Sequence, residues 1–398
     1  MTSTTGASPA MAPLEGIVVA DFSRVLAGPY ASMFLADLGA TVIKIERPGQ
    51  GDDTRSWGPP WTAIASSYFE SVNRSKLSVT LELKDPSDLA IARRIAEQAD
   101  VLVENFKAGT LDRYGLDYQT LSQVNPGLVY ASVTGFGSAE GASLPGYDFL
   151  VQAVGGLMSI TGEPDGEPLK VGVALVDVLT GKDAAIGILA ALRGREITGT
   201  GQRIEVNLLS SLLGSLVNQA SGALATGRAP GRMGNRHPSI TPYETLACAD
   251  APLAVACGND GQFARLTTVL GCPGLAADPR FATNAERVAH REELRRALES
   301  ALSTDTAAHW EELLVSAGLA AGRIADIPQA IDRARRLGLD PVYDVGEGRP
   351  AQIRHPILYS GHVPRRDLPP PRLGEHDAII RERYGRTTGP SDESEAMP

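Results

Sequence analysis

Short apolar runs and amphipathic stretches alternate along the first half of the chain. Residues 16–21 form an apolar run that predicts a buried strand, and residues 30–38 carry apolar side chains at helical spacing. A second strand is predicted at residues 41–47 and completes a strand–helix–strand unit. Such a unit favours parallel strands, because a crossover helix returns the chain to the same edge of the sheet.

The same alternation continues to about residue 210. Further strands are predicted at residues 77–83, 101–106 and 127–133, with helices at residues 85–98 and 118–124. This pattern predicts an α/β fold, with a doubly wound, Rossmann-like large domain. No G-x-G-x-x-G fingerprint follows the first strand, which argues against a nicotinamide-dependent enzyme.

The stretch 168–209 contains an acidic residue in a position that suits catalysis. An apolar run at residues 171–176 predicts a buried strand that ends at Asp177, and a turn at residues 179–181 leads into a helix. Backbone N–H groups at a helix start favour negative charge, so Asp177 is expected to stay ionised, as a nucleophile requires. An aspartate before a helix is more often a cap, and composition alone favours the cap.

A second, smaller α+β domain is expected after a change in composition near residue 227. At 398 residues the chain exceeds the usual size of one core. Residues 227–238 are rich in glycine and arginine, and residues 251–325 predict short strands and several helices. Residues 1–12 and 387–398 are small, polar or low in complexity, which predicts disordered tails.

Composition argues against several classes of function. Hydrophobic residues make up 43% of the chain and charged residues 21%, as in soluble globular proteins. The formal net charge of -10 argues against nucleic acid or an anionic membrane as the main partner. The three cysteines form no metal-ligand pattern and fit a reduced, cytoplasmic compartment. No signal peptide and no apolar run of membrane-spanning length is evident.

Eight short motifs occur in order between residues 13 and 202: Pro13-Leu14-Glu15-Gly16, Asp21-Phe22-Ser23-Arg24, Ala27-Gly28-Pro29, Leu35-Ala36-Asp37-Leu38-Gly39-Ala40, Lys44-Ile45-Glu46-Arg47, Asn73-Arg74-Ser75-Lys76, Glu104-Asn105-Phe106 and Thr198-Gly199-Thr200-Gly201-Gln202. Together they resemble the class III CoA-transferases, a family that includes formyl-CoA transferase and the carnitine CoA-transferases. The same superfamily contains the alpha-methylacyl-CoA racemases. The resemblance extends over about residues 13–380.

The resemblance implies that Asp177 is the catalytic nucleophile, because the family places it ahead of a short turn ending in Thr-Gly, here Thr180-Gly181. The carboxylate attacks an acyl-CoA thioester and forms an acyl-aspartyl anhydride with release of CoA thiolate. The thiolate returns to form an aspartyl-CoA thioester, and an acceptor carboxylic acid then takes over the CoA. Each step exchanges one activated acyl bond for another, so coenzyme A is expected as substrate and no metal or further cofactor is expected.

Family positions carried over one at a time imply a CoA-binding set. Arginine forks suit the phosphates of CoA, and the backbone near the strand ends would hold its adenine and pantetheine parts. The implied residues are Arg24, Val25, Leu26, Ala27, Arg47, Leu81, Lys84, Asn105, Phe106, Lys107 and Arg113.

Two departures from the formyl-transferring branch bear on the substrate. That branch has a glutamine where this chain has Leu26, and a run of glycines where this chain has Gly258-Asn259-Asp260-Gly261. Oxalate and formyl-CoA are therefore not the favoured substrates. Arg236 and His237 are candidates for acyl specificity, because they can pair with the second carboxylate of a dicarboxylic acid such as succinate.

Two alternatives stay open at this point. The racemases use a histidine in a Gly-His-Asp segment as one of two bases, whereas this chain has Gly146-Tyr147-Asp148. A tyrosine, whose usual pKa is about 10, is a poor general base at neutral pH, so the racemase comes second. Tyr147 and Asp148 are instead expected to support the site. The other alternative is a CoA-binding relative without catalysis.

The resemblance also implies a quaternary structure. Members of the family form homodimers of two interlocked rings, in which each chain has a large and a small domain. On that basis the large domain is expected at residues 13–210 and 330–385 and the small domain at residues 228–325. The loop Gly258 to Gly261 would then approach Asp177 of the same or the partner subunit.

Overall fold

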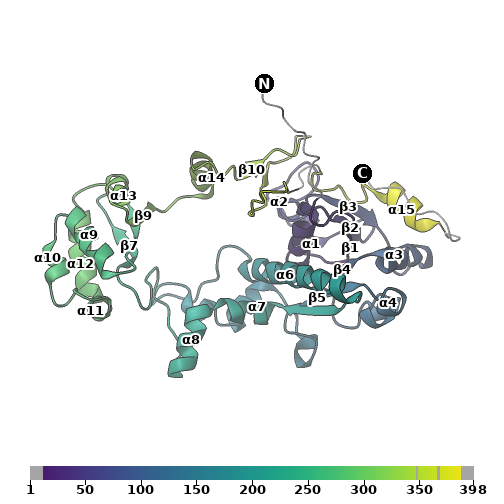
Figure 1. Cartoon of the computed structure of the whole chain (residues 1–398), viewed down its shortest axis with the longest axis horizontal. Helices are drawn as coiled ribbons and strands as arrows, with labels where there is room; N and C mark the ends of the chain where they lie inside the picture. Colours follow the sequence, from purple (N-terminus) through teal and green to yellow (C-terminus); the bar gives the residue numbers. More distant parts are fainter. Residues whose placement is uncertain (1–11, 347, 365–367, 387–398) are drawn as a thin grey trace. The chain divides into compact units, whose positions relative to one another are not determined.

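The computed structural model describes residues 12–346, 348–364 and 368–386 (Figure 1). The expected tails, residues 1–12 and 387–398, lie outside this part of the chain except for residue 12. Contacts between Cα atoms divide the chain into two compact units. The larger unit is drawn from Met1–Leu157, Val171–Thr226 and Asp340–Pro398, and the smaller from Met158–Lys170 and Gly227–Leu339.

A six-stranded sheet forms the centre of the larger unit, and all of its strand pairs are parallel. The strand order is β3-β2-β1-β4-β5-β6. This is the order of a doubly wound Rossmann-type sheet, so the predicted fold class is confirmed. The order reverses between β1 and β4, and loops from these two strands therefore leave in opposite directions. The strands are β1 (Val18–Asp21), β2 (Thr41–Glu46), β3 (Lys76–Thr80), β4 (Val101–Glu104), β5 (Val129–Thr134) and β6 (Arg203–Asn207).

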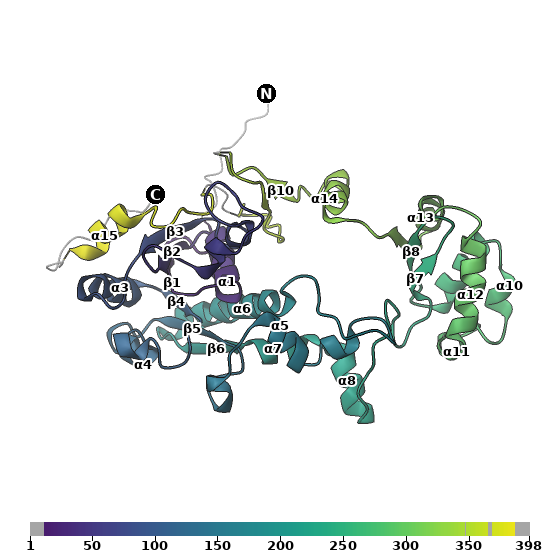
Figure 2. The same ribbon diagram turned by 180° about the vertical axis from the view of Figure 1, so that it is seen from behind.

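Helices cover both faces of this sheet (Figures 1 and 2). Successive strand residues point to opposite faces, so Val19 packs with α1 and α6 while its neighbour Ala20 packs with α3, α4 and α15. Both side chains are fully buried. Burial on both faces explains why the central strands β1 and β4 are apolar up to their last residue and show no alternating pattern. The covering helices are α1 (Ala27–Asp37), α3 (Pro86–Gln98), α4 (Tyr118–Val124), α6 (Leu175–Thr198) and α15 (Asp377–Gly385).

The remaining elements of the larger unit are short or lie beside the sheet. They are η1 (Asp53–Ser56), α2 (Ser67–Glu70), η2 (Asp112–Tyr114), η3 (Glu140–Ser143), α5 (Asp148–Val154), α7 (Leu208–Ser215), α8 (Val217–Thr226), and the two-stranded β10 (Val342–Tyr343) and β11 (Gln352–Ile353).

The strand predicted at residues 171–176 is absent, and the turn predicted at residues 179–181 lies inside α6. After β5 the next strand of the sheet is β6, which pairs directly with β5, and the chain between them forms helices and loops. Gly181 instead forms part of the contact between α6 and α1. A Cβ atom on Gly181 would lie 2.7 Å from the carbonyl oxygen of Ala27, so glycine permits the two helices to approach closely.

A glycine-to-alanine pair in α6 tests this close approach. We expect Gly181→Ala to lower the free energy of unfolding by about 1–3 kcal/mol, because the added methyl group meets backbone of α1. Gly194→Ala in the same helix is the matched control, since a Cβ atom added there would have its nearest neighbour 4.0 Å away. That substitution should stabilise the protein by about 1 kcal/mol through helix propensity. Equal effects in urea denaturation would contradict this account of the helix contact.

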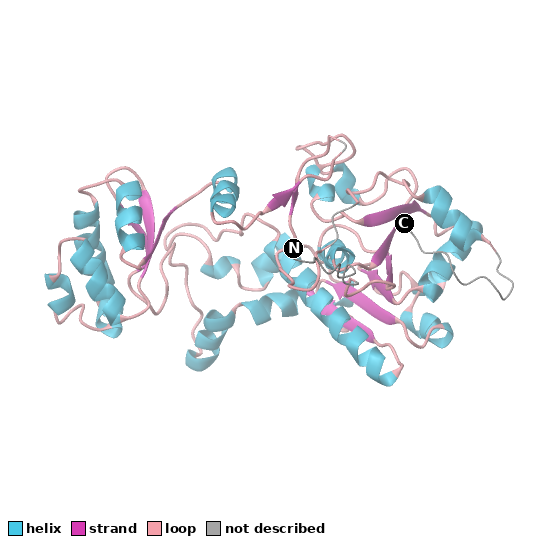
Figure 3. Ribbon diagram, turned by 45° about the horizontal axis from the view of Figure 1, so that its top comes forward, coloured by secondary structure: helices cyan, strands magenta, loops and turns pink. Residues whose placement is uncertain are grey.

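The smaller unit has its own core. An antiparallel sheet of β7 (Tyr243–Ala247), β8 (Pro252–Ala256) and β9 (Ala320–Arg323) packs against helices through apolar side chains that include Leu253, Phe263 and Leu298 (Figure 3). The unit's helices are η4 (Met158–Ile160), α9 (Asp260–Val269), α10 (Gly274–Ala277), α11 (Asn284–Ala289), α12 (Arg291–Leu302), α13 (Ala307–Ser316) and α14 (Ile327–Arg336).

Among the residues that the structure describes, no helix is both long and apolar enough to cross a membrane.

Candidate active site

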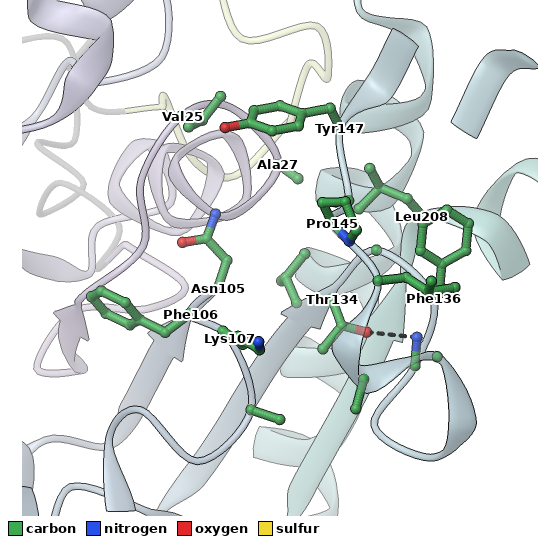
Figure 4. Close-up of a pocket in the computed structure, with 18 of the residues that line it drawn as sticks. Val25, Ala27, Asn105, Phe106, Lys107, Thr134, Phe136, Pro145, Tyr147 and Leu208 are labelled. Carbon is green, nitrogen blue, oxygen red and sulfur yellow. Dashed lines mark hydrogen bonds between the residues drawn. The ribbon is translucent and has the colours of Figure 1, made fainter. Parts of the chain in front are cut away.

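A cavity of about 400 Å³ lies at the carboxyl ends of β1, β4 and β5. In doubly wound sheets, ligands bind at this edge, beside the point where the strand order reverses. Figure 4 shows Asn105 and Lys107 on one side of the cavity and Phe136 and Pro145 on the other. The walls are formed by residues 24–27, 105–108, 133–137 and 141–147, together with Asp53, Asp177 and Leu208.

The loop after β1 is held by the loop after β4. The side chain of Asn105 accepts a hydrogen bond from the backbone N–H of Arg24 at 2.9 Å and donates one to the backbone oxygen of Arg24 at 2.7 Å. The Arg24 guanidinium lies over the ring of Phe106, 5.1 Å from its centre, and pairs with Asp53 at 3.3 Å. A cation and an aromatic ring therefore share one wall of the cavity.

Val25, at the tip of the loop after β1, has a strained backbone. Its φ angle is +71°, a left-handed conformation that is rare for a β-branched residue and costs on the order of 1–3 kcal/mol. The backbone N–H of Val25 faces both carboxyl oxygens of Asp52 at 3.3 Å. Asp52 in turn accepts a hydrogen bond from Lys44 at 2.9 Å. This buried acid therefore holds the strained turn in place.

A second buried ion pair lies beneath the same loop. Lys76 and Asp21 are both fully buried and lie 3.1 Å apart. Burial opposes ionisation of Asp21, but Lys76, Lys44 and the hydroxyl groups of two serines lower its pKa to about 2. Asp21 stays charged and anchors the backbone of the loop through Ser23. Both residues belong to sequence motifs named above, but no role was predicted for either.

Asp177 lies in the first turn of α6 and on the wall of the cavity. Asp148, in the first turn of α5, accepts hydrogen bonds from the backbone N–H groups of Val176 at 2.7 Å and Asp177 at 3.3 Å. Asp148 thus caps α6 from another helix. The predicted position of Asp177, between a buried strand and a helix start, is corrected to a position inside the helix.

The pKa of Asp177 is raised to about 7, by burial in the first place and by the negative charge of Asp148 in the second. At neutral pH the carboxyl group is therefore divided between its protonated and ionised forms. The helix start alone predicted a fully ionised group, but the first amides are already occupied by Asp148. A carboxylate with a raised pKa is a stronger nucleophile than an ordinary aspartate.

Two tyrosines lie near these acids. Tyr147 lines the cavity and is 61% exposed. Tyr68, in α2, packs against the buried cluster of Leu26, Met33 and Val72, against which Ala174 and Val178 also pack. Burial and the charges of Asp177 and Asp148 raise the pKa of Tyr68 to about 12, so its hydroxyl group remains protonated. Tyr68 was missed by sequence analysis, because it lies outside every motif that carried a prediction.

The loop that leads to Tyr147 is closed at its base by two glycines. A Cβ atom on Gly135 would lie 2.5 Å from the Cα of Gly146, and the reverse contact is equally short. Glu205 holds the outer part of the loop by accepting a hydrogen bond from the backbone N–H of Ser138 at 2.7 Å. This closure places the start of α5, with Asp148, beside the cavity.

Nine of the predicted residues line the cavity, namely Arg24, Val25, Leu26, Ala27, Asn105, Phe106, Lys107, Tyr147 and Asp177. Four predicted CoA-binding residues do not line it. Leu81 is buried in the core of the larger unit, and Arg47, Lys84 and Arg113 are exposed. The cavity therefore contains fewer cations than the motifs alone suggested.

The remaining predicted residues belong to the smaller unit. Asn259 caps α9, and Asp260 pairs with the buried Arg287 at 2.8 Å. Arg236 pairs with Glu292, and the ring of His237 lies 5.2 Å from that of Tyr243. Gly258 donates its backbone N–H to Gln262 at 2.6 Å, and Gly261 follows within α9. Each of these groups has a structural role within the unit.

No group of three or more histidine, cysteine or acidic side chains within residues 12–346, 348–364 and 368–386 is arranged to hold a metal ion.

Comparison with known proteins assigns the chain to a family. Residues 14–377 match the model of CoA-transferase family III. A succinate–glutarate CoA-transferase of Agrobacterium fabrum is 44% identical, covering 92% of this chain and 94% of that protein. An acetyl-CoA:oxalate CoA-transferase of Acetobacter aceti is 41% identical, covering 96% and 98%. A crystal structure of a CAIB/BAIF family protein from Brucella suis superimposes with a TM-score of 0.85 and 43% identity, covering 94% and 99%. The chain therefore belongs to CoA-transferase family III.

Proposed function

We propose that this CoA-transferase moves CoA between acids through covalent intermediates on Asp177. The observation that carries the proposal is the position of this carboxyl group, partly buried on the wall of a cavity whose other walls offer cations and open backbone. Within the described residues, no hydrogen bond engages the carboxyl oxygens of Asp177, so they are free to meet a thioester.

The reaction proceeds by four exchanges of acyl bonds. A carboxylate oxygen of Asp177 attacks the thioester carbon, the carbon–sulfur bond breaks, and CoA leaves as thiolate. The thiolate attacks the aspartyl carbonyl of the resulting anhydride and releases the donor acid. The acceptor carboxylate attacks the aspartyl-CoA thioester and frees the thiolate again. The thiolate finally attacks the acceptor acyl group, which yields the new acyl-CoA and restores Asp177.

The cavity walls suit coenzyme A in this proposal. Arg24 and Lys107 would meet phosphate groups, where charge-assisted hydrogen bonds are strong. The Phe106 ring would support the adenine or pantetheine part beside Asn105. Four further predicted residues would contact CoA only outside this cavity, namely Arg47, Leu81, Lys84 and Arg113.

We propose a short dicarboxylic acid, such as succinate, as one of the two acids. Support comes from the relative named as a succinate–glutarate CoA-transferase, which is similar over nearly the whole chain. Arg236 and His237 are the proposed specificity residues, and a second carboxylate would take the place that Glu292 holds beside Arg236. The relative named for oxalate is almost as similar, so oxalate belongs among the acids tested although the departure at Leu26 argues against it.

The proposed assembly is a homodimer of interlocked chains, with the loop Gly258 to Gly261 near the site. Support comes from apolar side chains that the single chain leaves exposed, which include Ile186 and Leu224 at 64% and 87% exposure. Such side chains favour association. We further propose the domain division of residues 13–210 with 330–385 and residues 228–325, and a cytoplasmic location.

Intact-mass spectrometry of the enzyme with a panel of acyl-CoAs tests the proposed function. The panel contains succinyl-, glutaryl-, oxalyl-, acetyl- and formyl-CoA, and hydroxylamine traps activated carboxyl groups before peptide mapping. We expect a hydroxamate on Asp177 with a dicarboxylic acyl-CoA. A lack of any adduct, together with exchange of the α-proton in deuterated water, would favour the racemase instead. Binding of CoA with neither result would favour the non-catalytic relative.

A further inference from the structure

The first turn of α6 receives its cap from α5. Ala174, at the position where a cap is usual, has no side chain that accepts a hydrogen bond. Oδ2 of Asp148 accepts hydrogen bonds from Val176 N at 2.7 Å and from Asp177 N at 3.3 Å. The amide groups that would otherwise stabilise an anion at this helix start are therefore occupied by a second acid.

Gln152 holds that acid in place one turn further along α5. Its Nε2 donates to the other oxygen of Asp148 at 2.6 Å, and its Oε1 accepts from the backbone N–H of Val171 at 2.9 Å. Gln152 is fully buried. One of these hydrogen bonds joins α5 to Val171, at the beginning of the segment that precedes Asp177. The other holds Asp148, which joins α5 to the end of that segment.

We propose that Asp148, held by Gln152, is a positioning residue that directs the Asp177 carboxyl group into the cavity and favours the acylated enzyme over the free carboxylate. This inference rests on the proposed function, in which Asp177 is the nucleophile. It adds a residue whose charge acts on the energies of the intermediates without touching the substrate.

The physical reason is the change of charge at Asp177 during the reaction. The free carboxylate is negative and is repelled by Asp148, whereas the anhydride and the aspartyl-CoA thioester are neutral at this position. Forming the new bond to the acyl carbon therefore relieves the repulsion while the thiolate carries the charge away. The raised pKa of Asp177 is consistent with this repulsion, after the larger effect of burial.

Other ionisable groups also surround the site. Tyr68 of α2 is neutral at the pH of interest, because its pKa is raised to about 12, and Tyr147 lies on the cavity wall at the start of α5. Arg24, Asp53 and Lys107 lie on the cavity walls and form its charged lining. Asp148 is the charged group that contributes to the raised pKa of Asp177 together with burial.

Asp148→Asn removes the charge and keeps the cap, because asparagine retains one oxygen that accepts hydrogen bonds from Val176 and Asp177, while the hydrogen bond from Gln152 is lost. In the unaltered enzyme, kcat should fall below about pH 7 as Asp177 becomes protonated. This fall is the acidic limb of the pH profile of kcat, and in the variant its midpoint should lie about one pH unit lower. The fraction of enzyme trapped as aspartyl-CoA, measured by intact mass at one concentration of succinyl-CoA, should fall about tenfold.

Three further variants separate positioning from folding. Asp148→Ala should also lower Tm, because the cap is lost. Gln152→Met retains the charge of Asp148 but releases it, so kcat should fall about tenfold with little change in KM. Asp183→Asn removes an exposed acid from the same helix and should leave the limb and the trapped fraction unchanged.

An unchanged acidic limb and trapped fraction in Asp148→Asn would overturn this inference, as would an unaffected kcat in Gln152→Met. If Asp177 of the unaltered enzyme carries no adduct with any acyl-CoA, the proposed function itself fails. A labelled Asp177 in the unaltered enzyme with identical behaviour in Asp148→Asn would reject only the role of Asp148.

Discussion

Asp177→Ala is expected to lower kcat by about 10³- to 10⁶-fold, because removal of a nucleophile leaves binding and electrostatic stabilisation without the covalent steps. The KM for acyl-CoA should change little, since the other groups that line the cavity remain. The measurement is CoA transfer from succinyl-CoA to a panel of dicarboxylic acids. Turnover within tenfold of the unaltered enzyme would contradict the proposed mechanism.

The same position should show a trade-off between stability and activity. The pKa of Asp177 is about 7 in the folded protein and about 3.8 when unperturbed, so the folded state holds the proton more tightly. The free energy of unfolding contributed by this group therefore falls as pH rises between these values. Above pH 7 the buried carboxylate destabilises the folded protein to its full extent. We expect Asp177→Asn to raise the free energy of unfolding by about 1–3 kcal/mol at pH 8.

Thermal unfolding at two pH values checks this expectation. The gain in Tm of Asp177→Asn should be larger at pH 8 than at pH 5, where the native side chain is already protonated. Asp183→Asn is the matched control, because Asp183 is exposed on the same helix and should give no gain that depends on pH. Equal gains in Tm at both pH values would show that the ionised carboxylate of Asp177 does not destabilise the folded protein.

The second large effect is expected from Lys76→Met. The ammonium group of Lys76 contacts three oxygen atoms, those of Asp21 at 3.1 Å and of Pro29 and Asn73 at 2.9 Å each. Removing it leaves the fully buried Asp21 without its ion-pair partner. Loss of one partner from a buried pair costs about 3–5 kcal/mol, so the midpoint of urea unfolding should fall strongly.

A double-mutant cycle separates the pair from the volume of the side chain. Asp21→Asn in the Lys76→Met background should recover part of the stability, because the buried charge is removed as well. Lys182→Met is the control for loss of a lysine charge, since Lys182 is exposed in α6. Additive losses in the double variant would mean that the two side chains act independently.

The buried pair also has a functional consequence. Asp21 anchors the backbone of the loop after β1 through Ser23, and that loop carries Arg24 and Val25 into the cavity. A weakened anchor should therefore raise the KM for acyl-CoA more than it lowers kcat. The pKa of Asp21, lowered to about 2 against the effect of burial, means that its stabilising contribution is present above about pH 4 and is lost as pH falls toward 2.

The sequence by itself determined the strands β1 to β5, their parallel pairing and the class of the fold. Residues 16–20 carry no polar side chain, and residues 41–47 contain the apolar Val42, Ile43 and Ile45, as is typical of strands whose two faces are both covered. The order of the motifs was sufficient to indicate the family, and the family in turn singled out Asp177. These properties depend on local periodicity and on the order of residues along the chain.

The tertiary structure alone decided the environment of the predicted nucleophile. Asp148 lies 29 positions before Asp177, yet its carboxylate occupies the amides of the helix in which Asp177 stands. The run at residues 171–176 was predicted as a strand, but Leu175 and Val176 begin α6 and Gly181 joins the contact of this helix with α1. Hydrogen bonds and burial depend on which segments, distant in sequence, come into contact. The periodicity of residues along the chain does not determine those contacts.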